Sequence, residues 1–287
     1  MRYCFTSLSS RAFIWALGIA PVFSLGMMGW TGQVLASDPV VAPPATLPAP
    51  APAPVARPVV AAPTVLTQTL AQIDAAASKG NLPGVMAFYA PQFTNSDGLT
   101  YSTFQDALSK FWKRYPGTVY KTEVNSWKAE GSAFVVETTT TVTGTQKTPD
   151  RPVSLTATIS SRQRFEGQKI VQQEVLSEKS QVTIGQTPPV VQVNLPERVT
   201  IGRNYAFDAI VTEPLGDRLL LGAALEETIN ANGYLNAAPI DLELLPSGGL
   251  FKIGRAPLIP ENRWVSAVVI RNDGMTAVTQ RMQVVGR

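Results

Sequence analysis

Residues 133–146 read AFVVETTTTVTGTQ, and this stretch decides the fold prediction. Its segment Thr138–Thr141 is β-branched throughout, which disfavours a helix and suits a strand. Short turns at Gly131-Ser132 and at Glu166-Gly167-Gln168 indicate hairpins between it and similar neighbours. The sequence therefore predicts a long antiparallel sheet. Its other Thr- and Val-rich strands are expected at about 118–129, 152–165 and 169–184.

The residues in front of these strands follow helical spacing instead. An apolar stripe predicts a first helix over 64–80, and a second, short helix follows over 83–91. A capping box of Ser102 with Gln105 predicts a third helix over 102–115. A twisted sheet can curl over such helices and leave a concave, half-apolar cavity. The expected architecture is an α+β cone, with three helices packed on a curved antiparallel sheet.

This order of elements resembles the nuclear transport factor 2-like superfamily, which includes the SnoaL-type polyketide cyclases and the ketosteroid isomerases. The segment 85–93, VMAFYAPQF, is similar to the helix of that group in which an aromatic-Ala pair precedes the first pocket turn. Residues 103–115 are similar to its third helix. The resemblance covers 64–185, less than half of the chain. It implies a cone-shaped fold, homodimers through the sheet, and either small-molecule chemistry or plain binding.

The resemblance also makes Asp97 a candidate base. Isomerase-like members place a carboxylate in the turn after the second helix, and Asp97 lies near that place. A carboxylate in an apolar pocket can move protons because burial raises its pKa toward working pH. However, Asp97-Gly98 is also a common turn dipeptide. Gln72, Ile73 and Asp74 stand where the resemblance expects a pocket tyrosine, so a turn residue is the favoured interpretation.

Aromatic side chains are the candidates for lining the predicted pocket. Aromatic residues at helical spacing pack in a core more often than they bind a ligand, so both interpretations stay open. The candidates are Tyr89, Tyr101, Phe111, Trp112 and Phe134.

Composition excludes several kinds of chemistry. The chain has no histidine, and Cys4 is its one cysteine. Catalytic Ser-His-Asp or Cys-His sets, histidine metal sites, intrachain disulfides and thiolate clusters cannot form. The sequence predicts no metal and no cofactor. Its 24 Lys and Arg against 21 Asp and Glu are scattered, whereas a nucleic-acid partner requires a clustered basic face.

The last third of the chain changes character after Pro188-Pro189, which predicts a domain boundary. Nearly all of 188–287 alternates between short strands and turns, and Asn272-Asp273-Gly274 is the strongest hairpin signal. This pattern is typical of an all-β sandwich, immunoglobulin-like in layout but without the cysteine pair. No group in it suggests chemistry.

The N-terminus predicts export. Residues 1–36 combine the positive Arg2 and Arg11 with a long apolar run and end at Val34-Leu35-Ala36, as a secretory signal does. The Pro/Ala-rich linker 37–63 favours polyproline II. Cleavage after Ala36 would make it a free tail. An uncleaved signal would act as an anchor, because its apolar run is long enough to span a bilayer.

These features together predict an exported, non-catalytic binding or scaffold protein of the cell envelope, whose pocket takes a small apolar ligand or a protein partner. The expected compartment is a periplasm or, in a photosynthetic bacterium, a thylakoid lumen, with a tether to the inner membrane if the signal remains. The alternative is a small-molecule isomerase or lyase of ketosteroid-isomerase type that uses Asp97 as base.

Overall fold

The structure is a computed structural model that describes residues 61–146, 151–214, 216, 219–236, 239–245, 248–271 and 274–286. The predicted signal and nearly all of the predicted linker lie outside the described residues. The described residues from Ala62 onward belong to one compact unit. Among them, none of the helices combines the length and apolar character that crossing a membrane requires.

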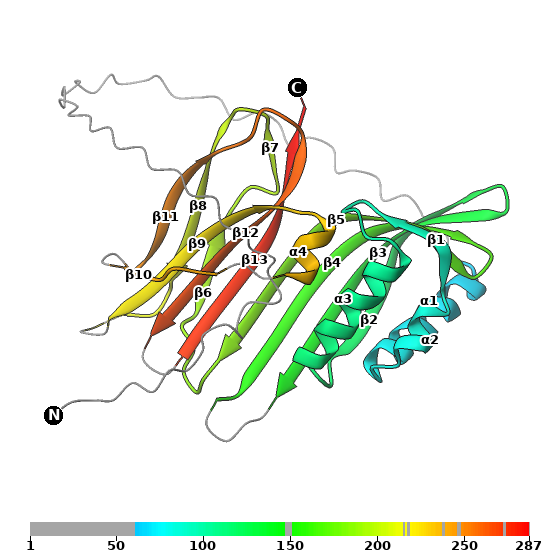
Figure 1. The fold of residues 1–287 in the computed structure, drawn as a ribbon, viewed down its shortest axis with the longest axis horizontal. Coiled ribbons are helices and arrows are strands. Elements are labelled where there is room, and N and C mark those ends of the chain that lie inside the picture. The colour runs from blue at the N-terminus through cyan, green and yellow to red at the C-terminus, as the bar shows by residue number, and fades with distance from the viewer. Residues whose placement is uncertain are drawn as a thin grey trace, which may run out of the picture. The chain divides into compact units, whose positions relative to one another are not determined.

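The helices of the described residues are short, and the predicted positions of the first and third are confirmed. The capping box before the third helix lies two residues earlier than predicted. There the Thr100 hydroxyl accepts from the Thr103 N–H at 3.4 Å, and the Thr103 hydroxyl accepts from the Thr100 N–H at 2.8 Å. The helices, shown in Figure 1, are α1 (Thr64–Ser78), α2 (Leu82–Met86), α3 (Tyr101–Arg114) and α4 (Ala231–Leu235).

The long strands in the first half are confirmed within a residue or so, but the second predicted helix is wrong beyond Met86. Tyr89–Asn95 forms a strand parallel to β5. Pro91 lies where the register of that pairing shifts, a place that tolerates a residue without an N–H donor. The strands are β1 (Tyr89–Asn95), β2 (Val119–Glu130), β3 (Ala133–Gln146), β4 (Val153–Glu166) and β5 (Lys169–Ile184).

After β5, the regular elements of the described residues are strands apart from the short helix α4. The predicted run of short strands in this part is confirmed. These strands are β6 (Val191–Asn194), β7 (Arg198–Thr200), β8 (Asn204–Val211), β9 (Leu220–Thr228), β10 (Glu243–Leu244), β11 (Gly249–Arg255), β12 (Glu261–Arg271) and β13 (Gly274–Val285).

One large sheet joins both parts of the chain. Its ten strands follow the order β10-β9-β12-β13-β5-β4-β3-β2, with β1 beside β5 and β7 beside β13. Strand β5 connects the two parts, because Lys179–Ile184 pairs with Met275–Gln280 of β13. β4 lies along the other edge of β5, antiparallel to it.

The predicted fold class, an α+β cone followed by an all-β sandwich domain, is therefore wrong. Strands β9, β12 and β13 extend the first sheet instead of forming a sandwich of their own, and strand dominates the described residues. A second sheet of three strands, β11-β8-β6, packs against them through a separate apolar core. An immunoglobulin-like domain is not confirmed. Local periodicity specifies strands but not which distant strands pair.

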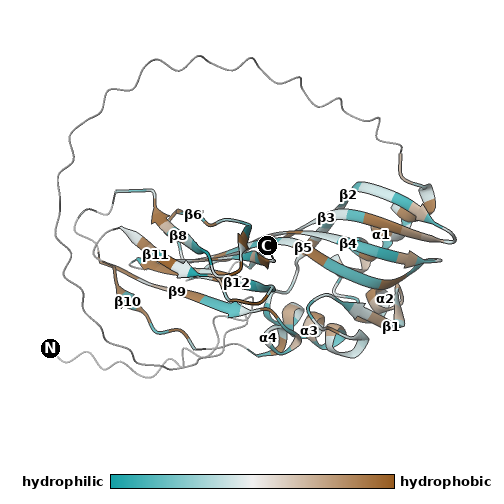
Figure 2. Cartoon of the chain, turned by 90° about the horizontal axis from the view of Figure 1, so that it is seen from above, coloured by the Kyte–Doolittle hydropathy of each residue, from teal (hydrophilic) through white to brown (hydrophobic). Residues whose placement is uncertain are grey.

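The large sheet is covered on both faces where β12 and β13 run. The helices lie on one face and β6, β8 and β11 on the other (Figure 2). Two neighbouring residues of β13 show the two covered faces. Arg281 contacts Asp97 on the helix side, while Met282 packs among Tyr205 and Phe207 on the other side.

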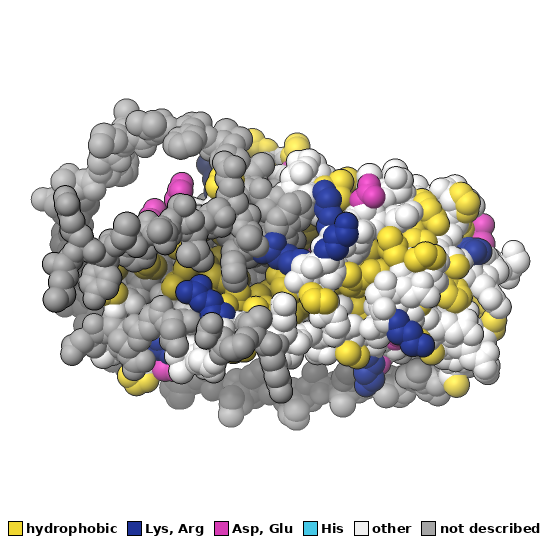
Figure 3. Space-filling model, turned by 60° about the horizontal axis from the view of Figure 1, so that its bottom comes forward, with side chains coloured by type: hydrophobic (Ala, Val, Ile, Leu, Met, Phe, Trp, Pro, Cys, Tyr) yellow, Lys and Arg dark blue, Asp and Glu magenta, His cyan; other side chains and the backbone are white. Residues whose placement is uncertain are grey.

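On the face that Figure 3 shows, Lys and Arg side chains are scattered.

Candidate functional site

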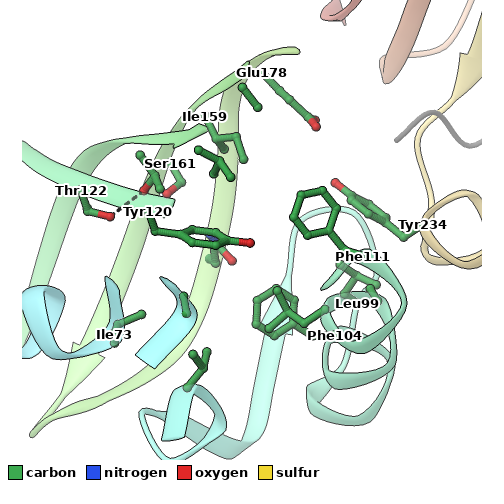
Figure 4. Close-up of a pocket in the computed structure, with 18 of the residues that line it drawn as sticks. Ile73, Leu99, Phe104, Phe111, Tyr120, Thr122, Ile159, Ser161, Glu178 and Tyr234 are labelled. Atoms are coloured by element: carbon green, nitrogen blue, oxygen red, sulfur yellow. Dashed lines mark hydrogen bonds between the residues drawn. The ribbon is translucent and has the colours of Figure 1, made fainter. Parts of the chain in front are cut away.

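A cavity of about 270 Å³ lies between the helices and the sheet. Its walls are mainly apolar and come from α1 and α3 on one side and β2–β5 on the other (Figure 4). Side chains on these walls include Leu70, Phe104, Phe111, Leu155 and Ile159, and β1 adds Tyr89.

A bulge in β5 controls which of its side chains face the cavity. Ser160 pairs with Ser177 but Ser161 pairs with Val175, so β5 carries one extra residue there. Gln173 and Glu178 differ by an odd number and would otherwise lie on opposite faces of a strand. With the bulge, both line the cavity.

The C-terminal strands complete one end of this cavity. Tyr234 of α4 and Trp264 of β12 line it, with their rings edge-to-face at 4.8 Å between centroids. The Asn230 side chain caps α4 by accepting from the Gly233 N–H at 3.0 Å. Gly233 permits the close approach, because a Cβ there would lie 2.9 Å from the Trp264 ring.

Asp97 lies behind this end of the cavity and is only 5% exposed. Arg281 donates Nη1–H to Oδ1 at 2.9 Å and Nη2–H to Oδ2 at 2.6 Å. The Tyr234 hydroxyl donates to Oδ2 at 2.6 Å. The turn itself is shaped by the Asn95 side chain, which accepts from the Asp97 N–H at 2.7 Å. Both carboxylate oxygens of Asp97 are thus engaged, and Asp97 is not among the residues that line the cavity.

Glu178 is the carboxylate on the cavity wall at this end. Its Oε2 accepts from the Trp264 indole N–H at 3.0 Å and from Arg281 at 3.5 Å. Figure 4 shows its carboxylate directed toward the space beside Tyr234. The C-terminal part therefore both lines this end of the cavity and orients the acidic group there.

Burial sets the charge states in this network. Burial raises the pKa of Tyr234 well above its ordinary value, and the negative charges of Glu178 and Asp97 raise it further. Burial alone would lower the pKa of Arg281, but the hydrogen bond to Asp97 and the charge of Glu178 outweigh it and raise that pKa. At neutral pH, Tyr234 is neutral and Arg281 is cationic.

The stability that Tyr234 contributes should therefore disappear at alkaline pH. A tyrosine whose pKa is higher in the folded state contributes fully below its unfolded pKa of about 10, and loses the contribution as pH rises through the folded value. We expect Tyr234→Phe to be less stable than the wild-type protein at pH 7, with a gap that narrows above about pH 10. Urea unfolding across this pH range measures the gap. A difference in stability that stays constant from pH 7 to above about pH 10 would contradict a raised pKa of Tyr234 in the folded protein.

Some of the predicted aromatic pocket residues line the cavity and others do not. Tyr89, Phe111 and Trp112 line the cavity. Tyr101 does not line it, and its hydroxyl lies 3.5 Å from the Met86 carbonyl oxygen. Phe134 also lies outside the lining and packs edge-to-face on Trp127, with 6.0 Å between ring centroids.

Sequence reasoning missed the residues from beyond the first five strands. Arg281 is 184 positions from Asp97, and Tyr234 is 137 positions away. One signal was present: Arg281 is the charged residue of a largely apolar strand, and a buried charge needs a partner. Nothing local identifies Glu178 or Trp264 as lining a cavity.

Comparisons with known proteins describe parts of the chain. A family profile described as "Domain of unknown function (DUF8623)" matches residues 186–285, the part that contains Tyr234, Trp264 and Arg281. No curated protein is significantly similar to the chain in sequence.

Several solved structures share a fold likeness with part of the chain. Bd1075 of Bdellovibrio bacteriovorus has 14% identity and a TM-score of 0.27, and the match covers 38% of each chain. A putative scytalone dehydratase from Novosphingobium aromaticivorans has 12% identity and a TM-score of 0.30 over 39% of this chain and 80% of its own. The Δ5-3-ketosteroid isomerase from Mycobacterium sp. has 10% identity and a TM-score of 0.26 over 39% and 91%. The last two are nuclear transport factor 2-like proteins, but likenesses of this size assign no activity.

Proposed function

We propose that the protein binds a small, mainly apolar molecule in this cavity and does not change it chemically. The observation that carries the proposal is the state of Asp97. Asp97, the base in the isomerase alternative, has both carboxylate oxygens bound by Arg281 and Tyr234 and does not line the cavity. A general base must reach the proton that it removes.

The cavity itself has the properties of a binding site. Ligand pockets are mostly apolar and span about 300–1,000 Å³, so a cavity of about 270 Å³ suits a small molecule. Burying apolar surface contributes roughly 25 cal/mol per Å². The aromatic and aliphatic walls can supply that burial without any reaction.

Filling the cavity should weaken binding of an apolar probe. We expect N-phenyl-1-naphthylamine, a neutral apolar fluorophore, to bind the full chain with a rise in fluorescence. Ala157 lines the cavity on β4, so Ala157→Phe should weaken this binding by at least about tenfold, because the phenyl group occupies the space of the probe. A fluorescence titration measures the dissociation constant.

Thr158→Phe is the matched control. It adds the same phenyl group at the next position of β4, where the side chain points to the opposite, exposed face. This variant should bind the probe as the wild-type protein does. Equal binding by Ala157→Phe and Thr158→Phe would place the probe elsewhere and defeat the proposal.

We also propose that the protein acts outside the cytoplasm. The support is the sequence of 1–36, with its basic start, apolar run and small-residue end. The test is fractionation of the producing cells with N-terminal sequencing of the recovered protein. A chain that starts at Ser37, or an intact chain in the membrane fraction, would agree with export, whereas an intact chain in the cytosol would contradict it.

A further inference from the structure

The cavity end beside α4 carries two acidic and two basic side chains. Two carboxylates, Asp97 and Glu178, share one guanidinium, that of Arg281. Lys110 is the second cation of this end, and its Nζ donates to the neutral Leu235 carbonyl oxygen at 3.1 Å. Throughout the described part of the chain, the ion pairs of Glu178 involve Arg281 alone.

Glu178 is the carboxylate that Arg281 contacts less closely. Arg281 makes its two short contacts with Asp97 and only a 3.5 Å contact with Glu178. Both donors to Glu178 approach Oε2, so neither occupies Oε1. The side chain is 16% exposed and lines the cavity, which makes a second donor from within the cavity its natural partner.

Aromatic rings surround the same end. Tyr234 and Trp264 pack edge-to-face there, and Figure 4 shows Phe111 beside Tyr234. Ring faces attract organic cations, most strongly where water is excluded. A carboxylate among aromatic rings is suited to an ammonium group more than to a neutral or anionic one.

A second polar group on the wall is independent of this cluster. Gln163 is 6% exposed and lines the cavity, and its buried Oε1 has no hydrogen-bond partner. Buried polar groups in proteins are nearly always paired. A ligand in the cavity can supply the missing partner when the Gln163 side chain turns toward it.

Glu178 and Gln163 are separated along the strands of the sheet. Glu178 pairs with Ile159, and Ile159 is four residues from Gln163 on β4. At about 3.3 Å per residue, their backbone positions are separated by roughly 13 Å. Ser161 and Ile159 line the cavity between them. A single extended molecule can contact both.

We propose that the cavity binds an elongated apolar amine, with its ammonium group against Glu178 and a hydroxyl at its far end on Gln163. The proposal rests on the binding function proposed above. A hydroxyl both donates and accepts, so it satisfies either end of the Gln163 amide. The apolar body lies between α3 and the face of β4.

Four probes with the same eight-carbon chain test the proposed amine binding. They are octylamine, octan-1-ol, octanoate and 8-aminooctan-1-ol, each measured by displacement of N-phenyl-1-naphthylamine from the full chain at pH 7. Octylammonium should bind at least about tenfold more tightly than octanol, and octanoate most weakly. 8-Aminooctan-1-ol should bind more tightly than octylamine.

Two variants test which residue binds each end of the ligand. Glu178→Gln should bring the affinities for octylammonium and octanol together while the affinity for octanol stays near its wild-type value. Gln163→Leu should remove the advantage of 8-aminooctan-1-ol over octylamine and keep the preference for the amine. The wild-type ranking tests the proposal even if a variant fails to fold.

The outcomes separate this proposal from the one on which it rests. Equal binding of octylammonium and octanol, or tighter binding of octanoate, would overturn the amine proposal and leave cavity binding intact. A ranking that Glu178→Gln does not change would also overturn it. Failure of the fluorophore to bind in the cavity would remove both proposals.

Discussion

Arg281→Met is expected to lower the free energy of unfolding by about 3–5 kcal/mol. The Arg281 side chain is 0% exposed and that of Asp97 is 1% exposed, so loss of the guanidinium leaves a buried carboxylate without its partner. Met retains much of the volume, which limits the effect of lost packing. Urea unfolding followed by tryptophan fluorescence and circular dichroism measures the change.

Arg162→Met provides the matched comparison. Arg162 pairs with Glu137 and Glu174, each at 2.8 Å, but its side chain is 45% exposed. Exposed ion pairs contribute about 0–1 kcal/mol, so this variant should remain close to the wild-type protein. Adding Asp97→Asn to Arg281→Met should recover part of the lost stability. If Arg281→Met and Arg162→Met lower the free energy of unfolding by similar amounts, the Arg281–Asp97 pair does not hold the C-terminal strands to the turn that contains Asp97.

Trp264→Ala should cost about 3–5 kcal/mol and also abolish binding of the fluorophore. Trp264 is 2% exposed, lines the cavity and packs on Tyr234, so its removal opens the cavity end. It also removes the indole N–H that orients Glu178. Urea unfolding measures the stability, and a fluorescence titration at a temperature where the variant is folded measures the binding.

Trp264→Phe separates the two roles of this residue. Phe keeps most of the ring packing but cannot donate to Glu178. It should therefore retain fluorophore binding and most of the stability, and weaken the preference for octylammonium over octanol. A Trp264→Ala variant that binds the fluorophore as the wild-type protein does would show that the C-terminal strands do not complete the cavity.

The strands β2–β5 could be predicted because their own residues specify them. Thr- and Val-rich runs with short glycine turns admit few other structures, as in Thr138–Thr141. β1 was missed because Pro91 reads as a helix end, whereas in the structure it lies at a break in strand pairing. Tertiary contacts explain the difference between the predicted helix and the observed strand, because Tyr89–Asn95 forms a strand only by pairing with β5.

The fold class could not be obtained in the same way. It depends on the pairing of Ile184 with Met275, which are distant in the chain. One clue was available in Trp264–Ile270, a nearly continuous apolar run typical of a strand buried on both faces. An outer strand of a small sandwich would alternate more regularly, so this run indicated a central place in a larger sheet.

The candidate site was predicted only in part. Local motifs located Asp97 in its turn, and helical spacing located Phe111 and Trp112. The partners that determine what Asp97 can do come from α4 and β13, and no local pattern specifies that contact. Chemistry inferred from one carboxylate was therefore incomplete without the fold.

The most direct test of the whole account is a crystal structure of the full chain with 8-aminooctan-1-ol. We expect electron density for the probe between α3 and β4, with its ammonium nitrogen within hydrogen-bond distance of Glu178 and its hydroxyl at Gln163. A cavity filled only by water or side chains, with the probe absent or bound on the outer surface, would contradict the account.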